Sequence, residues 1–342
     1  MCNAQESSFN KWKLRKMPYR AALGSINSLP SVQLESETIS VSILPDVGAK
    51  IYDLILKKSG RNILWHNPRI EPQRFPIEAN FDNYWSGGWD EGFPTCDACE
   101  HQGESYPNLG ELRSVCWKVE RVAENGNEAV AELSTFGPIS PVRAVKTVTL
   151  SGATVAVRYQ VTNLGPLPLD FIWGSHPALA VTEATVLHIP AKTGIVGLSS
   201  HPSLGRVGEK YDWPYLETTS GRIDISRVQG IEAGTSCGHY ATSLRAGWYA
   251  VEFSDLDMGL IFRFPLDLCP QLWMWLVYGG WRGYHHVIVE PWTSYPVNLA
   301  EAVRHNTHRR LQPEQTFVAE VSATVHDGLT DWQETLRRIE SR

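Results

Sequence analysis

Glu290 and His176 are the two residues of this chain whose types and surroundings point most directly to chemistry. Glu290 follows the β-branched run 287–289 and precedes Pro291, so it lies where a strand is expected to end. His176 comes directly before Pro177, and a glycine stands two positions before it, so regular strand pairing is expected to break there. A lone histidine is more often structural than catalytic. A carboxylate and an imidazole that meet in the fold can nevertheless act as base and acid, each able to reverse its role.

The chain contains 13 tryptophans, and several of them stand beside polar or charged residues. These are Trp85, Trp89, Trp173, Trp281 and Trp292. Aromatic faces stack on the C–H faces of sugar rings, while neighbouring carboxylates and amides bind the hydroxyls, so this pattern favours a carbohydrate pocket. The alternative is that tryptophans fill the core of a wide β-sandwich. We prefer the core for four that stand on apolar strands: Trp117, Trp248, Trp273 and Trp275.

Two adjacent histidines, His285 and His286, precede Glu290 on the same expected strand. Side chains alternate between the two faces of a strand, so at most one of these histidines can share a face with Glu290. His286 and Glu290 are four positions apart and therefore have the same parity. The spacing predicts that His286, Ile288 and Glu290 point to one face of a sheet.

The cysteines stand at positions 2, 96, 99, 116, 237 and 269, and only the pair at 96 and 99 is closely spaced. His101 follows that pair, which makes zinc binding an alternative to consider. A structural zinc site takes about four ligands, and no second pair with matching spacing is present. We therefore expect reduced cysteines, and no metal at Cys96, Cys99 and His101.

The composition limits the classes of function. Apolar residues make up 42% of the 342 residues, which is enough for a sizeable core. A net charge of -6 argues against nucleic acid or an anionic membrane surface as a partner. No stretch approaches the roughly 18 consecutive apolar residues of a membrane span, and the N-terminus shows no apolar signal-peptide segment. We expect a cytoplasmic protein without nucleic-acid or membrane partners, and the composition leaves its oligomeric state open.

Strand patterns are frequent along the chain, and helix patterns are scarce. Apolar and polar residues alternate from residue 39 to residue 43, and Gly152 separates two further strand patterns as a hairpin turn would. The expected strands are residues 39–44, 49–56, 144–150, 154–161, 249–253, 260–264 and 317–325. Many short strands separated by turn residues are typical of a sandwich or barrel. We predict an all-β fold, a large antiparallel β-sandwich that forms a single domain over residues 1–342.

One helix is expected at the C-terminus. Four large apolar residues recur there at spacings of 3, 4 and 3: Leu329, Trp332, Leu336 and Ile339. Such a stripe is typical of a surface helix that docks one face on the rest of the fold. The predicted sandwich core therefore covers about residues 38–326, and residues 327–342 form the docked helix.

The order of these motifs resembles the aldose 1-epimerase (galactose mutarotase-like) superfamily. Residues 163–179 carry a strand-end histidine followed by proline, and residues 287–296 carry a late glutamate before proline, as that superfamily does. Three earlier segments are similar to its N-terminal hairpin, its first pocket loop and its arginine-bearing loop: residues 44–65, 87–94 and 107–119. The resemblance covers roughly residues 38–326 and implies a large sandwich of many antiparallel strands.

The resemblance also implies a reaction. Glu290 matches the general base that takes the proton from the anomeric hydroxyl of a sugar. His176 matches the general acid that protonates the ring oxygen and so opens the ring to the free aldehyde. Rotation about the C1–C2 bond and reclosure then give the other anomer. This chemistry needs an acid and a base on opposite sides of the sugar ring and no cofactor.

Four further residues match substrate-contacting positions of the superfamily. Arg113 matches the arginine of the arginine-bearing loop, residues 107–119. Trp89 and Asp90 fall in the loop that is expected to stack on the sugar and bind its hydroxyls. Lys50 stands where relatives often carry an arginine. The resemblance therefore implies a small-molecule carbohydrate as the partner of this protein.

One position departs from the superfamily pattern. The loop histidine that usually bonds the sugar is replaced by Leu109. His101 is eight residues earlier, and we do not expect it to take that place. Because of this departure, the substrate could be an unusual sugar, for example an acidic one that Lys50 and Arg113 contact through its anionic group.

Two other functional classes stay open. The first is a non-catalytic carbohydrate-binding or regulatory protein on the same sandwich. The second is a lyase or hydrolase; a retaining hydrolase needs a second carboxylate about 5 Å from the first, which Asp90 or Glu91 could supply. We favour the mutarotase, because a simple binding protein needs neither the acid nor the base.

Overall fold

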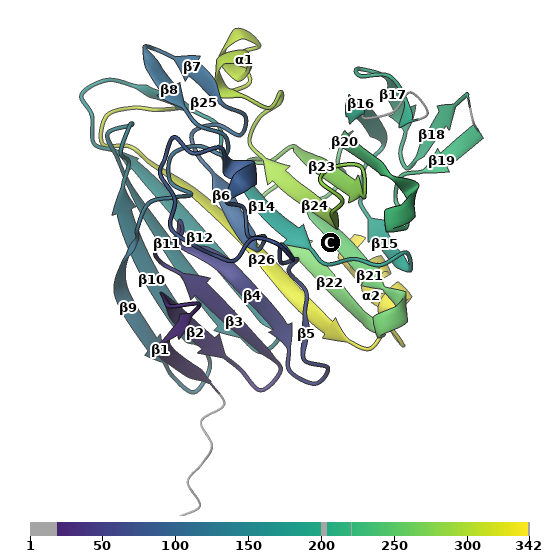
Figure 1. Cartoon of the computed structure of the whole chain (residues 1–342), viewed down its shortest axis with the longest axis horizontal. Helices are drawn as coiled ribbons and strands as arrows, with labels where there is room; N and C mark the ends of the chain where they lie inside the picture. The colour runs from purple at the N-terminus through teal and green to yellow at the C-terminus, as the bar shows by residue number, and fades with distance from the viewer. Residues whose placement is uncertain (1–18, 200–203, 220, 341–342) are drawn as a thin grey trace, which may run out of the picture.

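Two large antiparallel sheets make up most of the structure, a computed structural model that describes residues 19–199, 204–219 and 221–340 (Figure 1). The larger sheet has 12 strands and the smaller sheet has eight. Three pairs of short strands stand apart from both: β7 (Cys99–His101) with β8 (Glu104–Tyr106), β13 (Leu169–Phe171) with β25 (Arg309–Leu311), and β18 (Tyr215–Thr218) with β19 (Gly221–Asp224). The predicted all-β antiparallel sandwich is confirmed.

The larger sheet carries both candidate catalytic residues near its middle. Its strands lie in this spatial order: β1 (Arg20–Ile26), β2 (Leu29–Glu35), β3 (Ile39–Leu44), β4 (Lys50–Leu56), β6 (Trp89–Gly92), β14 (Gly174–Leu179), β24 (His285–Trp292), β23 (Gln271–Tyr278), β20 (Thr235–Thr242), β16 (Thr193–Ser199) and β17 (Lys210–Asp212). A short strand, β5 (Arg61–Asn62), pairs with β4 outside that order. Because β6, β14 and β24 are central strands, each has a neighbouring strand on both sides and its side chains can be covered on both faces of the sheet.

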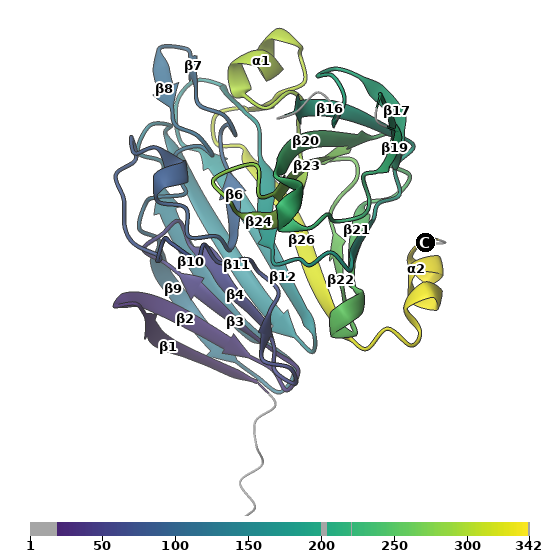
Figure 2. The ribbon, with the colours of Figure 1, turned by 45° about the vertical axis from the view of Figure 1, so that its right-hand side comes forward.

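The smaller sheet packs against one face of the larger sheet (Figure 2). Its strands lie in this order: β15 (Thr185–His188), β21 (Trp248–Phe253), β22 (Met258–Arg263), β26 (Thr316–Asp327), β12 (Thr154–Asn163), β11 (Val142–Ser151), β10 (Ala129–Phe136) and β9 (Lys118–Glu124). The predicted hairpin around Gly152 appears here as β11 and β12, and the predicted strands 249–253, 260–264 and 317–325 appear as β21, β22 and β26.

The main apolar core lies between the two sheets. Val157 and Tyr159 of β12 are buried, while Arg158 between them is exposed, as the alternation of strand side chains requires. Val41 and Ile43 of β3 belong to the same core from the opposite sheet. The alternation that was visible in the sequence thus reflects burial on the inner faces of the sandwich.

A second apolar cluster covers the other face of the larger sheet at its centre. Much of this cluster comes from the segment between β5 and β6, which contributes Trp65, Phe75, Phe81 and Trp85. These side chains pack with Ile288 and Trp292 of β24. A short 3-10 helix, η1 (Phe81–Asn83), shapes the segment, and the side chain of Asn80 caps it by accepting from the amide of Asp82. Residues on both faces of β24 are therefore buried.

Two α-helices occur in the described residues. The predicted C-terminal helix is present as α2 (Trp332–Glu340), and its buried face packs on Trp248, Ala250 and Ile261 of the smaller sheet. The other helix, α1 (Leu299–Arg304), was not predicted, because six residues are too few to show a helical period. Neither described helix is long and apolar enough to cross a membrane.

Candidate active site

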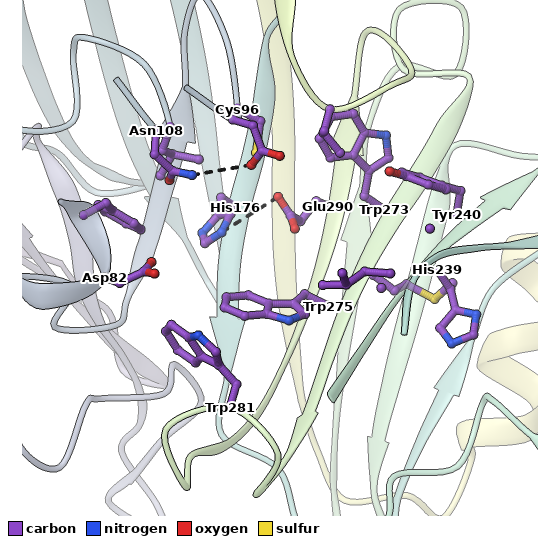
Figure 3. Close-up of a pocket in the computed structure, with 18 residues that line it drawn as sticks. Asp82, Cys96, Asn108, His176, His239, Tyr240, Trp273, Trp275, Trp281 and Glu290 are labelled. Atoms are coloured by element: carbon purple, nitrogen blue, oxygen red, sulfur yellow. Dashed lines mark hydrogen bonds and ion pairs between the residues drawn. The ribbon is translucent and has the colours of Figure 1, made fainter. Parts of the chain in front are cut away.

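His176 and Glu290 face each other on the two central strands β14 and β24. The register that pairs Gly174 with Trp292 and Ala178 with Ile288 places His176 directly opposite Glu290. Residues in such a cross-strand pair point to the same face of the sheet. The Nε2 atom of His176 lies 3.9 Å from Oε2 of Glu290, and the two side chains point toward each other in Figure 3. Two residues that are more than a hundred positions apart in sequence thus meet side by side.

Glu290 is held as a buried carboxylate with one strong donor. Its side chain is 6% exposed, and its Oε2 accepts a hydrogen bond of 2.9 Å from Nε1 of Trp292. Burial raises the pKa of Glu290, while the neighbouring His176 and the bond from Trp292 act in the opposite direction and Asp97 raises it further. A carboxylate whose pKa lies above its usual range is a stronger base than an exposed one, which suits proton abstraction near neutral pH.

His176 is buried, and its second ring nitrogen is unused. Nδ1 has no hydrogen-bond partner among the described residues. The ring meets Trp85 and Phe81 edge to face, at centroid distances of 5.7 Å and 6.5 Å. These aromatic neighbours fix the orientation of the imidazole without taking its protons. One nitrogen is therefore directed at Glu290, and the other is free to bond a ligand or water.

A cavity of about 360 Å³ opens over this pair. Its size lies within the range of roughly 300–1,000 Å³ that is usual for small-molecule sites. Aromatic side chains form much of its wall: Phe81, Tyr240, Trp273, Trp275 and Trp281. Asp82 of η1 and two loop residues, Asp97 and Asn108, add polar groups. Apolar walls with a few polar groups fit a polyhydroxylated ring that has apolar faces.

Two tryptophans that line the cavity, Trp273 and Trp275, were predicted to be core residues. Trp273 is buried in the second apolar cluster, so the prediction is confirmed for it, whereas Trp275 is only partly buried and the prediction is wrong for it. Trp273 and Trp275 line the cavity from β23, where they pair with Glu290 and Ile288 of β24. Their even spacing along β23 places both on the face of Glu290. The prediction is also confirmed for Trp117, which lies between the sheets, and for Trp248, which lies under α2.

Trp89 does not line the cavity, so its expected position is wrong. It points into the core between the two sheets, where it packs against Phe262 at 5.1 Å and donates from Nε1 to Oγ of Ser175 at 2.7 Å. Trp85, four residues earlier, is the tryptophan of that segment that contacts His176.

Asp90 and Lys50 lie on the active-site face of the sheet but behind the cavity wall. Asp90 is the cross-strand neighbour of His176 on the side away from Glu290. Its carboxylate lies 3.3 Å from Nζ of Lys50 and accepts from Nε1 of Trp85 at 3.3 Å. Lys50 also donates to the carbonyl of Gly87 at 2.7 Å. Neither side chain is among the lining residues, so both support Trp85 and His176 without reaching the space where a ligand would lie.

Arg113 also lies one layer behind the cavity. Its guanidinium sits between the rings of Phe75 and Phe81, 5.1 Å and 4.9 Å from their centroids. It donates to the backbone carbonyls of Asn108 and Ala79, and Nη1 has no partner among the described residues. Burial lowers its pKa to about 10, which Asp90 and Asp82 partly oppose. Arg113 thus braces two lining residues, Phe81 and Asn108.

Glu91 is on the wrong face to act with Glu290. It points between the sheets, and its Oε2 accepts from the buried Nζ of Lys146 at 2.7 Å. A retaining hydrolase that used Glu91 as its second carboxylate is therefore excluded by the alternation of β6. Asp90 shares the correct face, but its charge is already committed to Lys50.

The cysteine segment contributes to the wall of the cavity. Cys96 lines it, and burial, reinforced by Glu290 and Asp97, raises the pKa of its thiol. His101 turns away and bonds Asp170 through Nε2 at 3.2 Å. Among the described residues, no three histidine, cysteine or acidic side chains are grouped as metal ligands would be. Leu109, the departure from the superfamily pattern, lines the cavity directly.

Comparison with known proteins finds solved structures that have a similar fold. No family model matches the chain, and no curated protein matches it. A galactose mutarotase-like protein from Clostridium acetobutylicum superposes with a TM-score of 0.66 at 14% identity, over 91% of this chain and 99% of its own. A galactose mutarotase related enzyme from Lactobacillus acidophilus gives 0.60 at 16%, over 87% and 98% of the two chains.

A third structure, a galactose mutarotase-like protein from Lactobacillus casei, gives a TM-score of 0.60 at 16% identity, over 86% of this chain and all of its own. Identities this low establish the fold rather than the activity. All three similarities extend over most of both chains, so they concern the whole sandwich and not a local motif. The chain therefore has the same fold as these galactose mutarotase-like structures, the fold that the order of its sequence motifs predicts.

Proposed function

We propose that this protein is a sugar mutarotase of the aldose 1-epimerase type, with His176 as general acid and Glu290 as general base. The observation that carries the proposal is the cross-strand position of the two side chains, 3.9 Å apart under an aromatic-walled cavity. A protein that only bound sugars would have no need to bury a carboxylate against an imidazole, because each loses hydration in doing so.

The geometry suits the two oxygens that react. The resemblance implies an acid and a base on opposite sides of the sugar ring, whereas His176 and Glu290 are close neighbours. A neighbouring acid and base can still reach both oxygens, because the anomeric hydroxyl oxygen and the ring oxygen of a cyclic aldose are bonded to the same carbon. Glu290 takes the hydroxyl proton while His176 donates one to the ring oxygen, and the bond from C1 to the ring oxygen breaks. After rotation about C1–C2, His176 takes that proton back and Glu290 returns its own, so the enzyme is regenerated.

The walls of the cavity supply the rest of a sugar site. The indole faces of Trp275 and Trp281 are available to stack on the ring, and the amide of Asn108 can bond a hydroxyl. Lys50, Asp90 and Arg113 are assigned supporting roles, since each holds a residue that contacts His176 or lines the cavity. The possibility of an acidic sugar rested on Lys50 and Arg113 as anion contacts, and neither side chain lines the cavity.

The test is a direct measurement of anomer exchange. The protein is incubated with neutral aldoses, and interconversion is followed by NMR saturation exchange between the two anomeric protons, with polarimetry as a second readout. We expect acceleration over the buffer for at least one sugar that also raises the melting temperature. The proposal is overturned if none of the sugars that bind exchanges its anomers faster than in buffer.

One observation favours the alternative of a binding or regulatory protein. Leu109 occupies the cavity wall where the superfamily resemblance places a sugar-bonding histidine, so one polar contact is lost. In that case Glu290 is a hydroxyl acceptor, and its replacement weakens affinity. The exchange experiment separates the two functions, because only the mutarotase changes the rate.

A further inference from the structure

The floor of the cavity continues across the larger sheet beyond the acid–base pair. His176 of β14 lies opposite Glu290 of β24, and Glu290 pairs with Trp273 of β23. Trp273 in turn pairs with Tyr240 of β20. Cross-strand partners point to the same face of a sheet, and all four residues line the cavity. The pair that carries the proposed chemistry is therefore at one end of a row of side chains.

A second row runs beside the first and reaches one strand further, to β16. Trp275 of β23 pairs with Gly238 of β20, and Gly238 pairs with Leu198 of β16. These three residues also line the cavity. Neighbouring strands lie about 4.8 Å apart, so a floor that covers the five strands from β14 to β16 is about 19 Å across. Leu198 is 55% exposed, so the floor opens to solvent at the end away from His176.

Two glycines keep the outer part of this floor low. Gly238 has no positive φ, so its backbone does not require glycine, and the missing side chain leaves a hollow between Trp275 and Leu198. A Cβ at Gly238 would lie 3.1 Å from that of Leu198. A Cβ at Gly197 would lie 2.3 Å from a ring carbon of Tyr240, so the ring lies against the backbone of β16 there. A side chain at either position would take up space beside the cavity floor.

The floor beyond Glu290 also has an unused hydrogen-bond donor. Nε1 of Trp273 is buried and has no partner among the described residues, and the side chain lines the cavity. Trp273 meets Tyr240 edge to face at 5.7 Å, and both lie on the side of Glu290 away from His176 (Figure 3). A buried N–H without an acceptor costs free energy, and a hydroxyl oxygen of a ligand can accept from it. Apolar surface next to such a donor suits a sugar ring.

Resting on the proposed function, we infer that the site takes the reducing end of an oligosaccharide, with the second sugar ring over Gly238, between Trp275 and Leu198. Mutarotation requires a free anomeric hydroxyl, so only the reducing-end ring can lie at Glu290. A single pyranose ring is shorter than the floor and leaves its outer end unfilled. The next ring is joined through a different hydroxyl, so it extends away from the acid–base pair. The open end at Leu198 lets a longer chain continue into solvent.

Isothermal titration tests the inference with ligands that share one reducing-end ring. D-Glucose is compared with maltose, cellobiose, lactose and melibiose, which all have glucose at the reducing end and differ in how the second ring is attached. D-Galactose and β-1,4-galactobiose form a second series. We expect at least one disaccharide to bind about tenfold more tightly than the monosaccharide of its reducing end, because the second ring buries further apolar surface on the floor.

Two variants locate the second ring. Leu198→Ala removes the apolar side chain at the open end and should lower the preference for the disaccharide severalfold. Gly238→Val fills the hollow between Trp275 and Leu198 and should remove the preference. Val207→Ala is the matched control, because Val207 is another exposed aliphatic side chain and does not line the cavity. Melting temperatures show whether each variant is folded, and Leu198→Ala alone decides if Gly238→Val is not.

The inference is overturned if no disaccharide binds more tightly than its monosaccharide in either series, or if the folded variants keep the full preference. It is also overturned if none of the sugars binds. Failure of the proposed function looks different, because a disaccharide would then bind more tightly and depend on Leu198 while its anomers exchange no faster than in buffer. Faster exchange of glucose without any gain from a second ring would overturn only the inference.

Discussion

The ammonium of Lys50 lies 3.3 Å from the carboxylate of Asp90, and both side chains are almost completely buried behind the wall of the cavity. Burial lowers the pKa of Lys50, and Asp90 opposes that shift, so the pair keeps both charges only while both partners are present. Asp90 in turn holds Trp85, which packs on His176. The ion pair therefore helps to hold the imidazole of His176, the candidate general acid, in position through Trp85.

Removal of Lys50 should destabilise the fold strongly. Lys50→Met leaves Asp90 buried with only the indole donor of Trp85, and breaking a buried pair in this way typically costs about 3–5 kcal/mol. Urea denaturation measures the loss. The double variant Lys50→Met with Asp90→Asn should recover part of it, because no uncompensated charge remains. A loss as large in the double variant as in the single one would contradict this account.

Glu290→Gln should abolish most of the anomer exchange and leave binding intact. The amide keeps the shape of the side chain and can still accept from Trp292, but it cannot take a proton. General acid–base groups contribute roughly 10²–10⁴-fold, so a loss of that order in kcat is expected. His176→Asn should behave similarly, and the double variant should lose less than the sum of the two, because acid and base act in one step. Glu100→Gln serves as control, because Glu100 is an exposed carboxylate on β7 outside the cavity.

The pH profile should report the buried state of Glu290. Because burial raises its pKa above the ordinary 4.5, the carboxyl stays protonated to higher pH, and the acid limb of kcat/KM should lie above the usual carboxyl range. Trp292→Phe removes the hydrogen bond that lowers this pKa, so the limb should move further up. An unchanged limb in the variant would show that the carboxyl of Glu290 does not set it.

Replacement of Trp281 should weaken sugar binding, whereas replacement of Trp89 should lower the stability of the fold. Trp281→Ala removes an aromatic face from the cavity and should weaken sugar binding by about tenfold, with a small change in stability. Trp89→Phe should lower the melting temperature and leave the dissociation constant unchanged, because Trp89 packs between the sheets. Calorimetry of binding and of unfolding on both variants checks the pattern. Weaker binding in Trp89→Phe at unchanged stability would contradict the position described for it.

The sequence was a good guide to elements that have a period and to residues within them. Alternation predicted β3, β11, β12 and β26, and the stripe of apolar residues predicted α2. The shared parity of His286, Ile288 and Glu290 is likewise seen, since His286 and Ile288 pack with the aromatic cluster on the face of Glu290. Burial lowers the pKa of His286 to about 3, so its imidazole is neutral near pH 7. The prediction of a single domain stays a prediction, supported by the core that both sheets share.

The other residues of the candidate site could not be placed from the sequence, for physical reasons. Asp82 and Asp97 lie on irregular segments, whose path over a sheet leaves no periodic trace in the sequence. The resemblance implies Trp89 as a stacking residue, but the register of β6, which the sequence does not reveal, directs Trp89 to the core and Asp90 to the face of His176. Trp275 looked like a core residue because the floor of an aromatic cavity and a core have the same composition.

The pairing of β14 with β24 has a consequence for how the protein must fold. It joins segments that are more than a hundred residues apart, and β6, which flanks β14 on its other side, also comes from a distant part of the chain, whereas β23 directly precedes β24. Contacts of such long sequence separation close slowly, because loop entropy is lost before they form. A shift of one residue in this register would turn His176 into the core of the sandwich. After dilution from denaturant, the rate at which anomer exchange recovers should therefore equal the rate of the last refolding step. That rate reports when β14 and β24 have paired in the correct register.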